Sequence, residues 1–208
     1  MAAWERWGQA APQGDGRPAP SHRPQQVGAG AASPMTLLSE WVSATRALLN
    51  AETVTVNGVY VRLDEVSLNW PPTSVPPLLV GARGKKTLAL AGQIADGLAL
   101  DAGLSPDGVR AAVATAAAAR RQEMVVYLPC GAGHGARQRL EAELDLSRGF
   151  GSARVAVGSP GDVADTLRAF AAAGATTVVL QPAGDEPNID SILRLAAEAR
   201  IIIRDVPA

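Results

Sequence analysis

The chain of 208 residues has one cysteine, two histidines and no long apolar run, and each shortage excludes a class of protein. A single cysteine, Cys130, rules out an internal disulfide and is typical of the reducing cytoplasm, where we expect the protein. Two histidines without a cysteine cluster disfavour a metal enzyme, so we predict no metal site. No run approaches the roughly 18 apolar residues that span a bilayer, and we expect no membrane partner.

A strong charge of either sign is also absent. The formal net charge is −1, from 19 basic and 20 acidic residues. Because no large basic surface is available, nucleic acid is not expected as the main partner. The G-x-S-x-G elbow of many hydrolases is missing too, which disfavours that class of enzyme.

The stretch PLLVGARGKKTLALAGQIADGLALD, residues 77–101, is the centre of the pattern that is present. It predicts a short buried strand over 77–80, a basic glycine loop over 81–86, a helix, and a second apolar strand over 97–100. Strand, helix and strand in so short a stretch form a βαβ unit. The sequence therefore predicts an α/β fold with a parallel sheet.

The basic loop combines two glycines, Gly81 and Gly84, with the cations Arg83, Lys85 and Lys86. Glycines let the backbone approach a ligand closely, and the start of the following helix offers unpaired N–H groups and a positive dipole end. The loop is therefore predicted to hold an anion, a phosphate above all. It matches neither Walker A nor GxGxxG, so a plain strand-to-helix turn with solvated basic residues remains the alternative.

The rest of the chain extends this unit in both directions. Residues 1–32, rich in Gly, Pro and Gln, are predicted to be a disordered leader before a domain over 33–208. A helix after Ser33 is expected to bury an apolar stripe that includes Trp41, and Asn57-Gly58 between alternating valines predicts a β-hairpin over 53–63. Further strands are predicted over 123–128 and 176–180, and further helices over 105–121, 136–146, 162–173 and 188–200.

A second glycine loop, Cys130–Gly135, follows the strand predicted over 123–128. Loops at the carboxyl ends of parallel strands are where ligands bind in such folds, so His134 is a candidate to face a substrate. We favour a solvated residue at a helix start, because no carboxylate nearby in sequence is placed to orient the imidazole. Cys130 is predicted to be a small buried residue and not a nucleophile.

At residues 78–110, LLVGARGKKTLALAGQIADGLALDAGLSPDGVR, the chain resembles the luciferase-like monooxygenase superfamily. The similarity is to the branch that uses the deazaflavin coenzyme F-420, whose members typically read VGARGPKTLxLAGexADGvxL here. It continues through SPMTLLSEWVSATRALLNAETVTVNGVYVRLDEV and VGSPGDVADTLRAFAAAGATTVVLQP, and covers residues 27–200. It departs at Lys85, where the family usually has proline.

The resemblance implies a flavin- or F-420-dependent oxidoreductase, in which the cofactor ring exchanges hydride while the protein binds and orients it. It implies F-420 as the cofactor, with FMN as the alternative, and a small molecule as the substrate. Catalytic residues of the family come largely from its first four strands, so the resemblance assigns none here. The cofactor phosphate is expected to contact Gly81, Ala82, Arg83, Gly84 and Lys85.

The resemblance further implies a partial (β/α)8 barrel, roughly strands five to eight with a β-hairpin excursion, because the family's first four βα units have no counterpart before Ser33. A half barrel exposes inward-facing apolar side chains. We therefore expect either a homodimer that closes the sheet or a marginally stable, aggregation-prone chain. Three interpretations stay open: a truncated oxidoreductase, active or inactive; a non-catalytic remnant acting as a binding or dimerisation module; and an unrelated α/β phosphate-binding protein.

Overall fold

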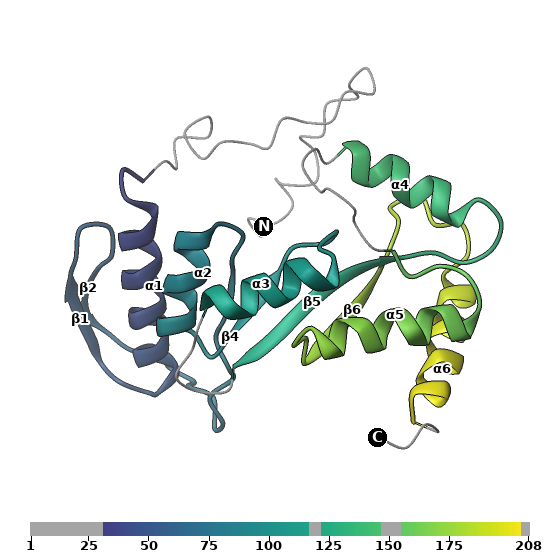
Figure 1. Ribbon diagram of the computed structural model, residues 1–208. Coiled ribbons are helices and arrows are strands. Elements are labelled where there is room, and N and C mark those ends of the chain that lie inside the picture. The colour runs from purple at the N-terminus through teal and green to yellow at the C-terminus, as the bar shows by residue number, and fades with distance from the viewer. Residues whose placement is uncertain (1–30, 117–121, 147–154, 205–208) are drawn as a thin grey trace. The chain divides into compact units, whose positions relative to one another are not determined.

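The computed structural model describes residues 31–116, 122–146 and 155–204 (Figure 1). The chain divides into two units between residues 30 and 31, and the described residues lie in the second. The predicted disorder of the leader therefore lies outside the described residues up to residue 30, as does the end of the helix predicted to reach residue 121. In the described part, no helix is long and apolar enough to cross a bilayer.

The described elements alternate between strands and helices after an initial helix and hairpin. In chain order they are α1 (Pro34–Leu49), β1 (Val54–Asn57), β2 (Arg62–Val66), β3 (Leu79–Gly81), α2 (Lys85–Ile94), β4 (Gly97–Leu100), α3 (Pro106–Ala116), β5 (Glu123–Cys130), α4 (Ala136–Leu146), α5 (Pro160–Ala172), β6 (Thr177–Pro182) and α6 (Ile189–Arg204).

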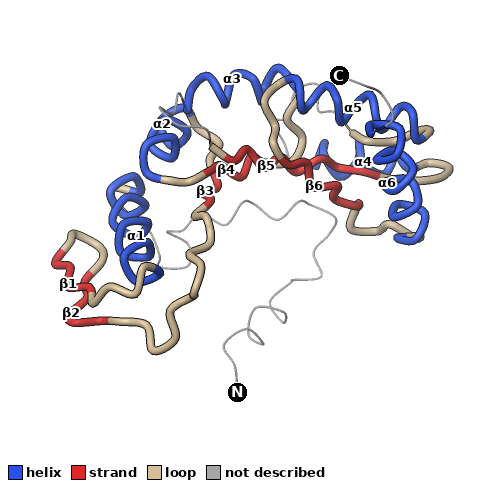
Figure 2. Tube along the Cα trace, turned by 90° about the horizontal axis from the view of Figure 1, so that it is seen from below, coloured by secondary structure: helices blue, strands red, loops and turns tan. Residues whose placement is uncertain are grey.

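Strands β3 to β6 form one parallel sheet in the order β3-β4-β5-β6, and β1 and β2 form a separate antiparallel pair. The prediction of an α/β fold with a parallel sheet is thereby confirmed. Each strand pairs with the next one along the chain, and helices α2, α3, α5 and α6 lie on the same side of the sheet (Figure 2). This is the arrangement that successive right-handed βα units produce.

The two faces of the sheet differ sharply in burial. The face toward the helices carries Leu98 and Val126, which pack with helix residues such as Phe170 into one apolar core. On the opposite face Leu79, Tyr127 and Val179 are 39%, 39% and 36% exposed, and helices α2, α3, α5 and α6 lie on the other side of the sheet (Figure 2). Within the described residues the opposite face is therefore less fully covered than the face toward the helices, although Val125 on it is buried.

The first helix differs from its prediction at Trp41. Val42 and Ala44 are buried and Leu38 packs against the core, so α1 does present an apolar side to the domain. Trp41, however, is 57% exposed, and the prediction that it packs into the core was wrong. The helical period places Trp41 on the same side of α1 as Leu38 and Val42, but the apolar side of α1 is broader than the part that packs against the domain.

The predicted hairpin is present, but its turn is longer than the Asn57-Gly58 dipeptide indicated. Strand β1 ends at Asn57 and β2 resumes at Arg62, with the N–H of Gly58 bonded to the carbonyl of Val61 at 2.9 Å. Val59, predicted to alternate in a strand, therefore lies in a four-residue connection. The left-handed φ that a two-residue type I′ turn requires at glycine is absent at Gly58.

The turn is shaped by Glu40 on α1. The carboxylate of Glu40 accepts hydrogen bonds of 2.9 Å from three consecutive backbone N–H groups, those of Val59, Tyr60 and Val61. These bonds lower the pKa of Glu40, the one from Val61 most. A Cβ at Gly58 would lie 2.5 Å from the Glu40 carboxylate, so a side chain here would displace that carboxylate from its present position. A contact distant in sequence thus overrides the local turn preference.

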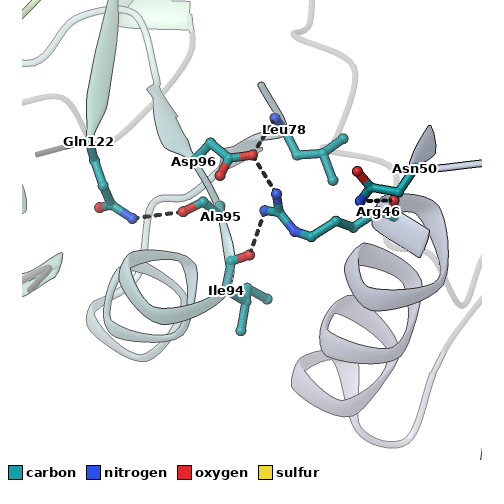
Figure 3. Close-up of polar contacts among 7 residues, drawn as sticks. All are labelled: Arg46, Asn50, Leu78, Ile94, Ala95, Asp96 and Gln122. Carbon is teal, nitrogen blue, oxygen red and sulfur yellow. Dashed lines mark hydrogen bonds and ion pairs between the residues drawn. The ribbon is translucent and has the colours of Figure 1, made fainter. Parts of the chain in front are cut away.

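The amino end of the sheet is joined by Arg46 and Asp96 (Figure 3). The Nη1 of Arg46, in the last turn of α1, donates to Asp96 Oδ2 at 2.8 Å, and its Nη2 donates to the carbonyl of Ile94 at 3.1 Å. The same Asp96 oxygen accepts from the N–H of Leu78 at 2.9 Å. One carboxylate therefore connects α1 to the start of β3 and to the end of α2.

Gln122, which directly precedes β5, also bonds to the end of α2. Its buried side-chain amide donates at 2.9 Å to the carbonyls of both Gly92 and Ala95, which belong to the last turn of α2 and its cap. Helix carbonyls of the last turn have no partner within the helix. Arg46 and Gln122 together satisfy two of them and the carbonyl of the cap Ala95, which anchors α2 against the sheet.

We predict that Arg46→Met destabilises the domain by about 1–2 kcal/mol, because hydrogen bonds to charged groups contribute about 1.5–3 kcal/mol and this pair is partly exposed. Methionine keeps much of the apolar stem. Urea unfolding followed by circular dichroism measures the change. The matched control is Arg110→Met, which removes an exposed pair with Asp107 and should stay within about 0.5 kcal/mol. Equal effects of the two substitutions would contradict this role of Arg46.

For Glu40→Gln we predict a pH-dependent loss of stability. The folded pKa of Glu40 lies below its ordinary value of 4.5, so its contribution is complete above that value and disappears as pH falls through the folded pKa. The variant should melt at a lower temperature than the wild type at pH 7, and the difference should shrink below pH 4.5. A difference that stays constant over this range would exclude the carboxylate as its source.

Candidate functional site

The predicted anion loop lies at the carboxyl end of the sheet, between β3 and α2. The five residues expected to contact a cofactor phosphate are Gly81, Ala82, Arg83, Gly84 and Lys85. All except Ala82 are exposed. Ala82 is buried and its N–H donates to the carbonyl of Ala99 at 3.3 Å, so the loop begins as a continuation of the β3–β4 pairing.

The helix that follows the loop starts without a side-chain cap. Gly84 is its N-cap, and the first helical bond runs from the N–H of Leu88 to the carbonyl of Gly84 at 2.9 Å. By contrast Ser33 caps α1 and Ser159 caps α5. The first turn of α2 holds no acidic residue but does contain Lys85 and Lys86, and cations at this end of a helix oppose its dipole.

The two glycines of the loop are not required by backbone strain. Neither Gly81 nor Gly84 has a left-handed φ, and Gly84 is extended at φ −84° and ψ 151°. A Cβ built on either one meets no atom within 4 Å. What the glycines provide is open space beside the backbone, which a close approach by a ligand requires.

Arg83 is paired across the sheet end with Asp101, which directly follows β4. Arg83 Nε lies 3.3 Å from Asp101 Oδ2, and the two side chains are 60% and 51% exposed. With Lys85 they line a cavity of about 190 Å³ whose floor is apolar, formed by residues including Leu88 and Leu100. The sequence analysis did not identify Asp101 as a site residue, although its position directly after a strand places it at the carboxyl end of the sheet, where ligands bind.

The donors gathered here match the chemistry of a phosphate group. They comprise the N–H groups of the first turn of α2, the guanidinium of Arg83 and the ammonium groups of Lys85 and Lys86. Backbone N–H groups at a helix start, together with lysine and arginine, are the common means of phosphate binding in proteins. The arrangement can bind and orient an anion, and no acid–base pair is formed among these residues.

The second glycine loop differs chemically from the first. Strand β5 reaches Cys130, which is buried as predicted. Burial, followed by the charge of Glu186, raises the pKa of the Cys130 thiol to about 11. Because the thiol stays protonated at neutral pH, Cys130 is not an activated nucleophile.

His134 is exposed at the start of α4, and its carbonyl accepts from Arg139 Nη1 at 3.2 Å. The Arg139 Nη2 also pairs with Glu186 Oε2 at 3.2 Å, and the side chain of Glu186 is 1% exposed. This buried pair was not found by sequence reasoning, because its two residues are far apart in the chain. It attaches α4 to the loop after β6. His134 lines an open cavity of about 930 Å³ between α4 and α5.

The chain matches the model of a protein family. The model of the luciferase-like monooxygenase family matches residues 14–134, more than half of the chain and including the β3–α2 loop. The chain is 32% identical over 88 residues to the 5,10-methylenetetrahydromethanopterin reductase of Methanolobus tindarius, covering 42% of this chain and 27% of that protein. It is 36% identical over 69 residues to the F420-dependent glucose-6-phosphate dehydrogenase of Nakamurella multipartita, covering 33% of this chain and 20% of that protein.

A solved structure shares the fold. The coenzyme F420 dependent tetrahydromethanopterin reductase from Methanopyrus kandleri superposes with a TM-score of 0.62 at 17% identity, over 83% of this chain and 62% of that one. The match thus spans less than two thirds of the length of that enzyme, and much smaller parts of the two sequence relatives.

Proposed function

The chain belongs to the luciferase-like monooxygenase family, and we propose that it is an F-420-dependent oxidoreductase whose β3–α2 loop holds the cofactor phosphate. The observation that carries this proposal is the uncapped, cationic start of α2 at the carboxyl end of a parallel sheet. The names of the relatives favour F-420 over FMN, since one sequence relative and the solved structure are both described as dependent on it.

In this proposal the protein binds and orients the cofactor. The first-turn N–H groups of α2 and the side chains of Arg83 and Lys85 hold the phosphate, with Arg83 able to bond two of its oxygens at once. The buried N–H of Ala82 keeps the loop in line with the sheet. When bound, the deazaflavin ring supplies hydride exchange. A small molecule is the proposed substrate, and the buried, protonated Cys130 is in keeping with the cytoplasmic location that we propose.

We further propose that β3 to β6 are strands five to eight of a (β/α)8 barrel. Two observations support this assignment: the strands are adjacent in sequence order, and α2, α3, α5 and α6 lie on one side (Figure 2). The structural neighbours are barrels of this type. Leu79, Tyr127 and Val179 would then face the barrel interior, which accounts for apolar side chains on the uncovered face.

We predict that the double variant Arg83→Gln, Lys85→Gln binds F-420 at least tenfold more weakly than the wild type. Two charge-assisted contacts are lost, and a tenfold change corresponds to about 1.4 kcal/mol. Titration followed by F-420 fluorescence measures the dissociation constant. Arg137→Gln is the matched control, because Arg137 is equally exposed and pairs with Glu141 on α4.

Two results would contradict the proposal. Unchanged affinity in the double variant would remove the loop from the binding site. Inorganic phosphate that stabilises the wild type against heat as strongly as F-420 does would instead favour an unrelated phosphate-binding protein. Ligand at about a hundred times its dissociation constant adds roughly 2.7 kcal/mol to a folded state that binds it, so the comparison is within reach of a thermal melt.

A dimerisation module is the second candidate function, favoured by the uncovered face of the sheet. Exposed Leu79, Tyr127 and Val179 lie on a face that the described helices leave open. Tyr127 and Val179 are direct partners in β5 and β6, and apolar side chains exposed together on one face are typical of association sites. We propose that a second copy of the chain covers this face, whether or not the cofactor is bound.

For this candidate we predict that the wild type sediments as a dimer and that the double variant Tyr127→Glu, Val179→Glu sediments as a monomer. Charges on the covered face would remain unpaired after association, which is costly. The control, Val59→Glu, places the same charge on an exposed valine of the hairpin turn and should leave the dimer intact. A monomeric wild type in analytical ultracentrifugation at 100 µM, on the order of a weak dissociation constant, would exclude the module.

A further inference from the structure

The pair of Arg83 with Asp101 joins the ends of two neighbouring strands. Gly81 at the end of β3 is the Cα partner of Ala99 in β4, so the residues that follow them lie side by side. Arg83 Nε lies 3.3 Å from Asp101 Oδ2. The guanidinium contacts the carboxylate through its Nε.

Folding stability does not explain this pair well. Both side chains are more than half exposed, and exposed ion pairs contribute little to folding because water and salt screen them. Arg83, Asp101 and Lys85 nevertheless line the same cavity of about 190 Å³. The effect of the pair is therefore expected on what enters the cavity mouth, where the direction of the guanidinium decides which contacts a ligand makes.

We propose that Asp101 is a positioning residue for the bound anion: its carboxylate holds the guanidinium of Arg83 at the mouth of the cavity, so that a phosphate at the start of α2 meets a side chain already oriented. This inference rests on the proposed function, since it concerns the same loop. A long arginine side chain loses rotamer freedom when a ligand fixes it, and a partner that fixes it beforehand removes part of that cost.

Asp101 also has an opposite effect, because a carboxylate near the site repels a phosphate. The two effects are separable by their dependence on Arg83. Positioning acts only through the guanidinium, whereas repulsion acts on the ligand directly and persists when Arg83 is absent. A double-mutant cycle over Arg83 and Asp101 isolates the part that belongs to the pair.

The experiment measures F-420 dissociation constants by fluorescence for the wild type, Asp101→Asn, Arg83→Gln and the double variant. We expect Asp101→Asn to weaken binding about threefold to tenfold in the wild-type background, within the usual range for coupled pairs. In the Arg83→Gln background it should not weaken binding at all. Asp101→Glu, which restores the carboxylate, should recover part of the affinity.

The control is Asp107→Asn, which removes the same charge from an exposed residue of α3 that is not among the residues lining the cavity, and it should leave affinity unchanged. Circular dichroism establishes that each variant is folded. If the wild type binds and Asp101→Asn binds equally or more tightly, the inference is overturned while the proposed function stands. If the wild type binds neither F-420 nor FMN, the proposed function is overturned and the inference with it.

Discussion

The hydrogen bonds made by Asp96 are the constraint on which the arrangement at the amino end of the sheet depends. Asp96 sits between α2 and β4 and accepts from both Arg46 on α1 and the N–H of Leu78 before β3. Its own N–H returns a bond to the Leu78 carbonyl at 2.9 Å, and its carbonyl accepts from Glu123 at 3.2 Å. A single residue thus fixes α1, β3, β4 and β5 against one another at the amino end of the sheet. The N–H of Leu78 would otherwise be an unpaired backbone donor at a strand start, where a lost partner is costly.

The same constraint determines where the candidate site lies. Strand β4 runs only from Gly97 to Leu100, so Asp101 follows Asp96 after about 16 Å of extended chain, at about 3.3 Å per residue. Strand β3 starts one residue after Leu78 and ends at Gly81, after which the loop brings Arg83 beside Asp101. Because both strands are held at their amino ends, their carboxyl ends have little freedom of register. The pairing of Arg83 with Asp101 is therefore a consequence of fixed strand lengths and a fixed origin.

Local pattern was sufficient to predict much of the domain, and contacts between distant residues account for what it missed. The βαβ unit, the hairpin and the four parallel strands follow from apolar periodicity and from glycine and proline placement. The form of the hairpin turn depends on Glu40, which is 19 residues or more from the amides it binds, and no turn rule includes such a partner. The prediction that Trp41 is buried was wrong, because apolar periodicity assigns residues to one side of a helix without giving the width of the surface that covers that side. In the candidate site the β3–α2 loop itself was predictable from the sequence. The ion-pair partners were not: Asp101 is brought to Arg83 by the order of the strands, and Glu186 is brought to Arg139 by the docking of α4.

The charges at the start of α2 make the local stability of the loop depend on what it binds. A lysine in the first turn opposes the helix dipole by about 0.3–1 kcal/mol, and the proline usual at position 85 in the resembling family would have restricted the unfolded chain and favoured the helix start. Lys85 therefore lowers the stability of the unliganded loop in two ways, through its charge and through the absence of proline. Asp101 offsets part of the charge by pairing with Arg83, but that pair is exposed and weak. An anion at the helix start would reverse the sign of the dipole effect and engage both cations. With the anion site that we propose, the departure at Lys85 would cost stability in the unliganded protein and return it through binding, which would couple the order of the loop to its occupancy.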